Sequence, residues 1–226
     1  MTMPALTVYK SRFLKADRRT VIQTADSQTY RTTFEQQARF DDIFMLPGTS
    51  LRPDTAGLTG QLLVLPIVGG ALLTTVQETD RALLPGCIYT IPAADARSFT
   101  LTNPFEQETV NLLLLQAPVP TAISDTVQEF LLPLTTKNVL ITTENQALPA
   151  RVGLYDSRVK DTIPTSNPSS FSLCYVINGS FEIEDRLVEH RDALLFWETP
   201  EIDFEALSET AILFCLEFAG VLPGPG

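Results

Sequence analysis

The stretch FSLCYVINGSFEI, residues 171–183, carries the clearest local signal in the chain. Apolar residues alternate on either side of Asn178-Gly179, a pair that suits a type I′ turn because both central residues of that turn need positive φ. We therefore predict a β-hairpin with strands over 171–177 and 180–183. Alternation with a period of two puts every second residue of each strand on one face, which we expect to point inward. These residues are Phe171, Leu173, Tyr175, Ile177, Phe181 and Ile183.

Short runs of apolar and β-branched residues recur over the rest of the chain, each closed by Gly, Pro, Asn or Asp, while helical periodicity is scarce. The strongest runs are 43–46, 62–68, 71–76, 87–91, 99–102, 110–116, 193–197, 202–206 and 211–218. Turn formers stand between them, such as Gly69-Gly70, which we interpret as a hairpin turn. The pattern predicts an all-β protein built as a sandwich or a barrel.

A Pro-containing stretch over 117–133 divides these runs into two sets. Each set ends in an apolar strand, NLLLLQ over 111–116 and AILFCLEF over 211–218. We predict two domains, 1–118 and 119–226, each long enough to bury its own core. A single large sandwich is the alternative that the pattern leaves open.

The net charge of −11 is concentrated in the second predicted domain, which holds 16 acidic and 6 basic residues. We expect no nucleic-acid partner, because such a field repels a phosphate backbone. A basic cluster near the N-terminus is the exception, and we expect it either to form a solvated face or to dock on the acidic half. Its members are Lys10, Arg12, Lys15, Arg18 and Arg19.

No apolar stretch approaches the roughly 20 residues that a membrane helix needs. The basic residues near the N-terminus follow the apolar ones, which reverses the order of a secretory signal. We therefore expect a cytoplasmic protein with no membrane partner. Cys87, Cys174 and Cys215 are widely separated and odd in number, so we interpret them as buried thiols rather than as a disulfide framework.

Three segments of the first half, VLPIVGGALL (64–73), LLPGCIYTIPA (83–93) and LTNPFEQETVNLLLLQ (101–116), resemble the N-terminal barrel of pirin-like proteins. The segment over 177–218 resembles the C-terminal barrel of the same group, which contains pirin and bacterial quercetin dioxygenase-like bicupins. The resemblance implies two tandem cupin-type jelly-roll barrels. It also implies a divalent metal held by histidines and a glutamate, with which some members oxidise flavonols.

The positions that would hold this metal carry other residues. In the family the last histidine lies four residues before an Asn-Pro pair that matches Asn103-Pro104, and that position is Phe99 here. The region of the paired histidines, 55–60, reads TAGLTG, and the glutamate position falls at Leu62 or Leu63. An imidazole-based oxygenase site needs at least two histidines, and the chain has one. We predict no metal and no cofactor.

The single histidine, His190, lies in a polar stretch, and we expect it to be an exposed turn residue. A zinc site made from His190 and the three cysteines would have no pair of ligands close together in the sequence. We also expect the polar residues that flank the turn at the entry to an apolar strand to bond backbone groups at the barrel rim. These residues are Asn103, Glu106, Glu108 and Asn111.

Leu62 and Phe99 are thus the candidates for lining the interior of the first barrel. Such an interior is either filled or open to a small apolar ligand, and the sequence does not choose. The leading hypothesis is a metal-free pirin-like bicupin that binds a small molecule or a protein partner. The alternative is an enzyme, either a quercetin 2,3-dioxygenase-like oxygenase or another oxidoreductase acting in a barrel. Barrel edges also indicate a homodimer.

Overall fold

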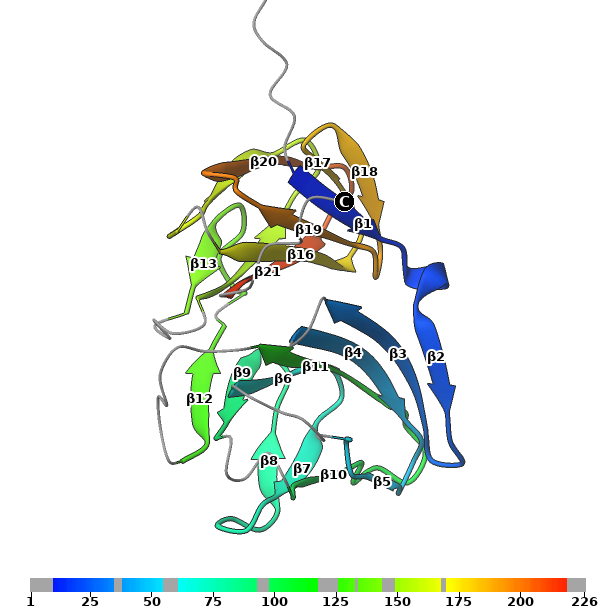
Figure 1. Ribbon diagram of the computed structural model, residues 1–226. Helices are drawn as coiled ribbons and strands as arrows, with labels where there is room; N and C mark the ends of the chain where they lie inside the picture. Colours follow the sequence, from blue (N-terminus) through cyan, green and yellow to red (C-terminus); the bar gives the residue numbers. More distant parts are fainter. Residues whose placement is uncertain are drawn as a thin grey trace, which may run out of the picture.

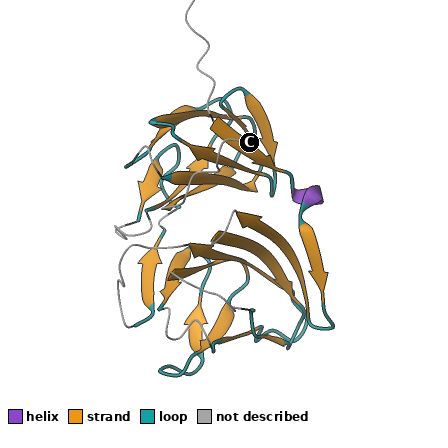
Figure 2. Ribbon diagram, in the orientation of Figure 1, coloured by secondary structure: helices purple, strands orange, loops and turns teal. Residues whose placement is uncertain are grey.

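The computed structural model describes residues 10–34, 38–54, 61–92, 98–117, 126–132, 134–143, 149–167 and 170–218. Strands make up most of these residues, turns and loops connect them, and the described helical structure is one short 3-10 helix, η1 (Ala16–Arg18), as Figure 2 shows. The predicted all-β class is confirmed. None of the described helical structure is long and apolar enough to cross a membrane.

Two antiparallel sheets form the lower part of the molecule in Figure 1. The larger has seven strands in the order β12 (Gln128–Leu131), β9 (Cys87–Ile91), β6 (Gln61–Val68), β11 (Val110–Ala117), β4 (Ala38–Met45), β3 (Ser27–Phe34) and β2 (Thr20–Gln23). The smaller has four strands in the order β5 (Ser50–Leu51), β10 (Thr100–Thr102), β7 (Ala71–Thr74) and β8 (Arg81–Leu83).

A second pair of antiparallel sheets forms the upper part (Figure 1). Its larger sheet has six strands in the order β1 (Lys10–Leu14), β19 (Ala193–Trp197), β16 (Phe171–Asn178), β21 (Ala211–Phe218), β14 (Ala150–Tyr155) and β13 (Leu140–Thr142). Its smaller sheet has four strands in the order β15 (Lys160–Pro164), β20 (Glu201–Ala206), β17 (Ser180–Ile183) and β18 (Arg186–Glu189).

Three apolar clusters hold these sheets together. The first lies between the seven-stranded sheet and its smaller partner, and the second lies between the six-stranded sheet and its smaller partner. The third lies between the two large sheets. Strand β11 shows why this needs long apolar runs: Leu112 and Leu114 enter the first cluster, whereas Leu113 and Leu115 point the other way into the third. Both faces of the central strands of the large sheets are therefore buried.

The predicted hairpin over 171–183 is wrong in its pairing. Strands β16 and β17 belong to different sheets, and the chain passes from one sheet to the other at Gly179, whose φ is +76°. Asn178 is not in the left-handed region, whereas Glu184 and Asp185, with φ of 47° and 58°, form the tight turn between β17 and β18. A type I′ turn therefore exists here, but it lies six residues further along the chain than Asn178.

The expected inward face of residues 171–177 is also wrong. Phe171, Leu173 and Tyr175 lie in the third cluster, between the two large sheets. Cys174 and Val176 lie in the second cluster, together with Phe181 and Ile183. Gly69 repeats this arrangement in the first half, since it carries the chain from β6 to β7 in the other sheet with a φ of +70°. Gly69-Gly70 is thus a corner between sheets and not the hairpin turn that we expected.

One strand from each predicted domain pairs with a strand of the other domain. Strand β1 pairs with β19 along residues 10–14, and β12 pairs with β9 along residues 128–131, so neither strand pairs within its side of the predicted boundary at residue 118. Part of the basic N-terminal cluster docks on the acidic half, which is one of its two predicted roles, whereas Arg12 and Arg18 are exposed. Lys10 contacts Glu198 at 2.5 Å, and Lys15 contacts Asp192 at 2.8 Å.

Candidate functional site

The two candidate lining residues lie in the enclosed apolar cluster of the first half. Leu62 has no exposed surface and Phe99 is 2% exposed, and both pack in the cluster that joins β4, β6, β9 and β11 to the smaller sheet. Segment 55–60, where the resemblance places paired histidines, lies outside the described residues. Leu62 and Phe99 are thus apolar core residues in the described part of this interior.

A polar row continues from Leu62 across the seven-stranded sheet. In the strand register Leu62 stands opposite Gln116, and Gln116 stands opposite Arg39. The next row brings Asp41 opposite Arg31, which donates from Nε and Nη2 to the two carboxylate oxygens at 2.8 and 2.9 Å. Arg39 Nε lies 3.1 Å from the same carboxylate. The end of the apolar interior is therefore bordered by two guanidinium groups that share one buried acid.

The pKa values of the two arginines shift in opposite directions, although the carboxylate of Asp41 favours the charged form of both. Its hydrogen bonds raise the pKa of Arg31, whereas burial lowers the pKa of Arg39. Arg39 also donates to the backbone oxygen of Asp54, immediately before segment 55–60. The arrangement anchors the end of this interior and presents guanidinium groups, which suit the recognition of carboxylates, beside apolar side chains.

The described residues contain no group of three or more His, Cys, Asp or Glu side chains placed to hold a metal ion. His190 is exposed in the turn after β18, as predicted. Asn103 is buried and bonds backbone groups, also as predicted: its Nδ2 donates to the oxygens of Met45, Leu46 and Glu108 at 2.8–3.1 Å. Asn103 therefore stabilises a loop.

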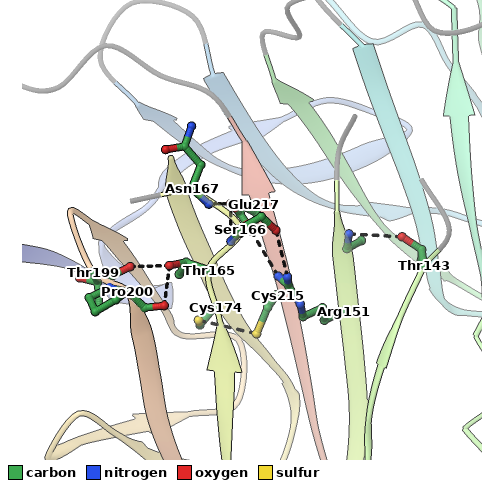
Figure 3. Close-up of polar contacts among 11 residues, drawn as sticks. Thr143, Arg151, Thr165, Ser166, Asn167, Cys174, Thr199, Pro200, Cys215 and Glu217 are labelled. Atoms are coloured by element: carbon green, nitrogen blue, oxygen red, sulfur yellow. Dashed lines mark hydrogen bonds and ion pairs between the residues drawn. The ribbon is translucent and has the colours of Figure 1, made fainter. Parts of the chain in front are cut away.

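The three cysteines are buried and free, in agreement with the sequence analysis. Cys174 and Cys215 stand directly opposite each other on β16 and β21, with a distance of 3.6 Å between their Sγ atoms (Figure 3). This pair could not be found from the sequence, because only the strand order brings the two residues together. Burial raises the pKa of Cys215 well above its usual value, which keeps it as an unreactive thiol.

A buried ion pair closes one end of the enclosed cluster in the second half (Figure 3). Arg151 Nη1 lies 3.5 Å from Glu217, and the same carboxylate accepts the backbone N–H groups of Ser166 and Asn167 at 3.0 Å. Next to it, Thr165 donates to the backbone oxygens of Thr199 and Pro200. These contacts fasten the segment after β15 to β21, so we interpret the cluster as structural.

A shallow acidic groove lies on the outer face of the smaller sheet of the second half. Several of its carboxylates are already engaged: Glu205 contacts Arg158 and Lys160, and Asp203 accepts a hydrogen bond from Thr162. Glu184 accepts the backbone N–H of Asp203 at 2.7 Å, and partial burial raises its pKa. The groove is acidic, but these carboxylates are engaged in contacts within and beside the sheet on which they lie.

A polar cluster that was not anticipated from the sequence lies between the two large sheets. Asp42 on β4 is fully buried and accepts hydrogen bonds from Asn111 at 2.7 Å, Tyr175 at 3.1 Å and Arg191 at 2.7 Å. Arg19, from the segment that links β1 and β2, places Nη1 at 3.8 Å from the same oxygen as Arg191. Both halves of the molecule thus contribute to one carboxylate.

The four sheets, arranged as two similar pairs packed through their larger members, define an all-β protein with the cupin fold. Solved structures show the same fold over nearly the whole chain. YhhW from Escherichia coli matches with a TM-score of 0.76 at 10% identity, over 95% of this chain and 100% of that one. The nickel(II) complex of the bacterial pirin YhhW, also from Escherichia coli, matches with a TM-score of 0.75 at 12% identity, over 94% and 100%.

The protein YlbA from Escherichia coli matches with a TM-score of 0.69 at 10% identity, over 96% of each chain. Searches with the sequence find no matching protein-family model and no similar curated protein. At such low identities these similarities establish the fold, and the function must be argued from the residues of this chain.

Proposed function

We propose that this chain is a pirin-like protein of two tandem cupin-type barrels, over residues 1–118 and 119–226, which acts by binding and not by metal-dependent oxidation. The observation that carries the proposal is the burial of Leu62 and Phe99 in one continuous apolar cluster. The resemblance to pirin-like proteins puts metal ligands at these positions, and neither a leucine nor a phenylalanine side chain has a lone pair to offer a metal.

The chemistry of the first interior favours a small ligand with an apolar body, or a protein partner that contacts the end of the barrel. Apolar side chains make up the described part of this interior, and Arg31, Arg39 and Asp41 border its end. Under the same proposal the protein is cytoplasmic and acts without a nucleic-acid or membrane partner. A homodimer joined through its exposed sheet edges is part of the proposal.

The alternative is an oxidoreductase like the quercetin dioxygenases. The likeness to a bacterial pirin solved in complex with nickel(II) favours this alternative. Chemistry weighs against it, since one exposed histidine in 226 residues cannot supply an imidazole-based oxygenase site.

Oxygen uptake separates the two functions. Purified protein is incubated with quercetin in air-saturated buffer after separate loading with Mn, Fe, Co, Ni, Cu or Zn salts, and oxygen consumption is recorded against a metal-active pirin as the positive control. We expect no consumption above that of the salts alone. Turnover that depends on the protein and on one metal would contradict the proposal and favour the oxygenase.

A further inference from the structure

The cluster around Asp42 carries more positive than negative charge. Its two guanidinium groups, Arg19 and Arg191, share the single carboxylate of Asp42. Arg191 approaches through Nε at 2.7 Å, while Arg19 stays at 3.8 Å, beyond a direct hydrogen bond. Burial lowers the pKa of Arg19, and nearby Arg191 acts in the same direction. A guanidinium nevertheless keeps its charge in a protein, so one positive charge is left over.

No other carboxylate of the described chain balances this charge. The neighbouring acid, Asp192, is engaged elsewhere: its Oδ2 accepts a hydrogen bond from Lys15 and its Oδ1 accepts the backbone N–H of Ala16, both at 2.8 Å. Tyr175 cannot serve as an anion, because burial raises its pKa well above the usual range. An unbalanced buried charge is costly, and proteins normally pair it.

The same arginines have N–H groups that lack an acceptor. Among the described residues, Arg19 Nε and Nη1 and Arg191 Nη2 are buried without a hydrogen-bond partner. The flat faces of the groups are covered, with Arg19 4.8 Å from the Phe40 ring centroid and Arg191 4.3 Å from that of Tyr30. Stacking on a ring satisfies the face of a guanidinium but not its N–H edge. Within the described part of the chain, the N–H groups on Arg19 Nε and Nη1 and on Arg191 Nη2 therefore remain without a hydrogen-bond acceptor.

The two arginines differ in their exposure to solvent. The Arg19 side chain is 2% exposed, whereas that of Arg191 is 21% exposed. Arg191 is thus the more accessible of the two side chains, although its Nη2 is buried. Arg191 is also held in the left-handed region, with a φ of 67°, which fixes the direction of its side chain at some cost in backbone strain.

We propose that Arg19 and Arg191 form a binding site between the two large sheets for a small monoanionic carboxylate. A carboxylate brings a single negative charge, equal to the excess, and two oxygens that suit guanidinium N–H edges. The site is separate from the first interior, because Asp41 and Asp42 point to opposite faces of the seven-stranded sheet, as their contacts show. It therefore stands or falls independently of the function proposed above.

Acetate titrations test the site. The thermal unfolding midpoint is measured in a low-salt zwitterionic buffer with increasing sodium acetate, sodium chloride or acetamide, for the wild type, Arg191→Gln and Arg18→Gln. Arg18 is the matched control, since it neighbours Arg19 in the chain but is exposed. We expect acetate to raise the midpoint of the wild type and of Arg18→Gln with saturation, acetamide to have no effect, and Arg191→Gln to lose the acetate effect.

Equal, non-saturating effects of acetate and chloride in all three proteins would reveal only ionic strength and overturn the site. A saturating effect of chloride but not of acetate would overturn the carboxylate assignment. If Arg191→Gln does not fold, line broadening of ¹³C-labelled acetate by the wild type, compared with Arg191→Lys, provides the same decision. Broadening that is equal for the two proteins, or absent from both, would also contradict the proposal.

Discussion

Asp42 is the residue where polar groups from both halves of the molecule converge, and it shows what sequence reasoning could not reach. Its partners Arg191 and Tyr175 lie 149 and 133 positions away, and no local pattern connects such residues. Leu62 and Phe99 are different, because the family resemblance and the apolar runs around them both predict a buried position. Burial of single residues was therefore predictable here, while the polar cluster depended on the packing of two sheets.

Replacing Asp42 by Asn should be among the most damaging single changes in the chain. It would leave two buried guanidinium groups without their carboxylate, and breaking a buried pair in this way typically costs about 3–5 kcal/mol. The free energy of unfolding, measured in urea, provides the test. Asp17→Asn is the control, because Asp17 is exposed. A loss no larger than that of the control would show that Asp42 does not organise the cluster.

Tyr89 makes a pH-dependent contribution to stability. Burial raises its pKa to about 12, and its hydroxyl accepts the backbone N–H of Leu84 at 2.9 Å. The unfolded chain loses this proton near pH 10, so the contribution is complete below about pH 10 and disappears as the pH rises towards about 12. The stability of the wild type should therefore fall across this window.

In the Tyr89→Phe variant the fall should be shallower by about 1.4 kcal/mol per pH unit, which is the effect of one proton. The variant should also lose about 1 kcal/mol below pH 10, because Leu84 N–H loses its acceptor. Urea titrations at several pH values measure both effects. Parallel pH profiles for the two proteins would contradict the assignment.

At the scale of elements, the strands were predicted better than their partners. The run at 171–177 is a strand as expected. At Gly179, however, the chain passes into another sheet, because strand pairing depends on distant residues. The same error occurs at Gly69-Gly70, where a turn signal was correct and its hairpin interpretation was wrong. Glycine at these corners indicates a backbone with positive φ, and this conformation occurs both in tight hairpins and in passages between sheets.

Gly179→Ala should disrupt the second of these corners. A methyl group would lie 2.2 Å from Ser208 Oγ, which accepts the backbone N–H of Ser180, and the φ of +76° disfavours any side chain. We expect a loss of about 2 kcal/mol or more, measured by urea unfolding. Gly48→Ala is the control, since φ is +65° there but nothing lies within 4 Å of the added carbon. Equal losses would mean that backbone strain alone matters.

At the scale of the whole molecule, the two halves share one apolar cluster and exchange strands. The third cluster contains residues of both large sheets, and β1 carries the N-terminal segment onto the second half (Figure 1). The sequence indicated the all-β class, and docking on the acidic half was one of two roles that it left open for the basic residues. It could not indicate the crossing strands, because their partners are decided by the packing of the sheets.

We expect this shared cluster to make the two halves unfold together. Leu113→Ala, in the third cluster on the first half, should cost about 2–5 kcal/mol through the lost contacts and the cavity. Fluorescence of Trp197, the single tryptophan, reports the second half, while far-UV circular dichroism reports both. The two probes should shift to lower urea by the same amount. An unchanged Trp197 transition would show that the halves unfold separately.

The central claim, a pirin-like chain that binds without a metal, is tested most directly by metal content. Untagged protein is analysed by elemental mass spectrometry as purified and after incubation with Mn, Fe, Co, Ni, Cu and Zn salts followed by gel filtration. We expect every metal to remain far below one equivalent per chain. One tightly held equivalent of any of them would contradict the account and make the oxygenase alternative the leading one.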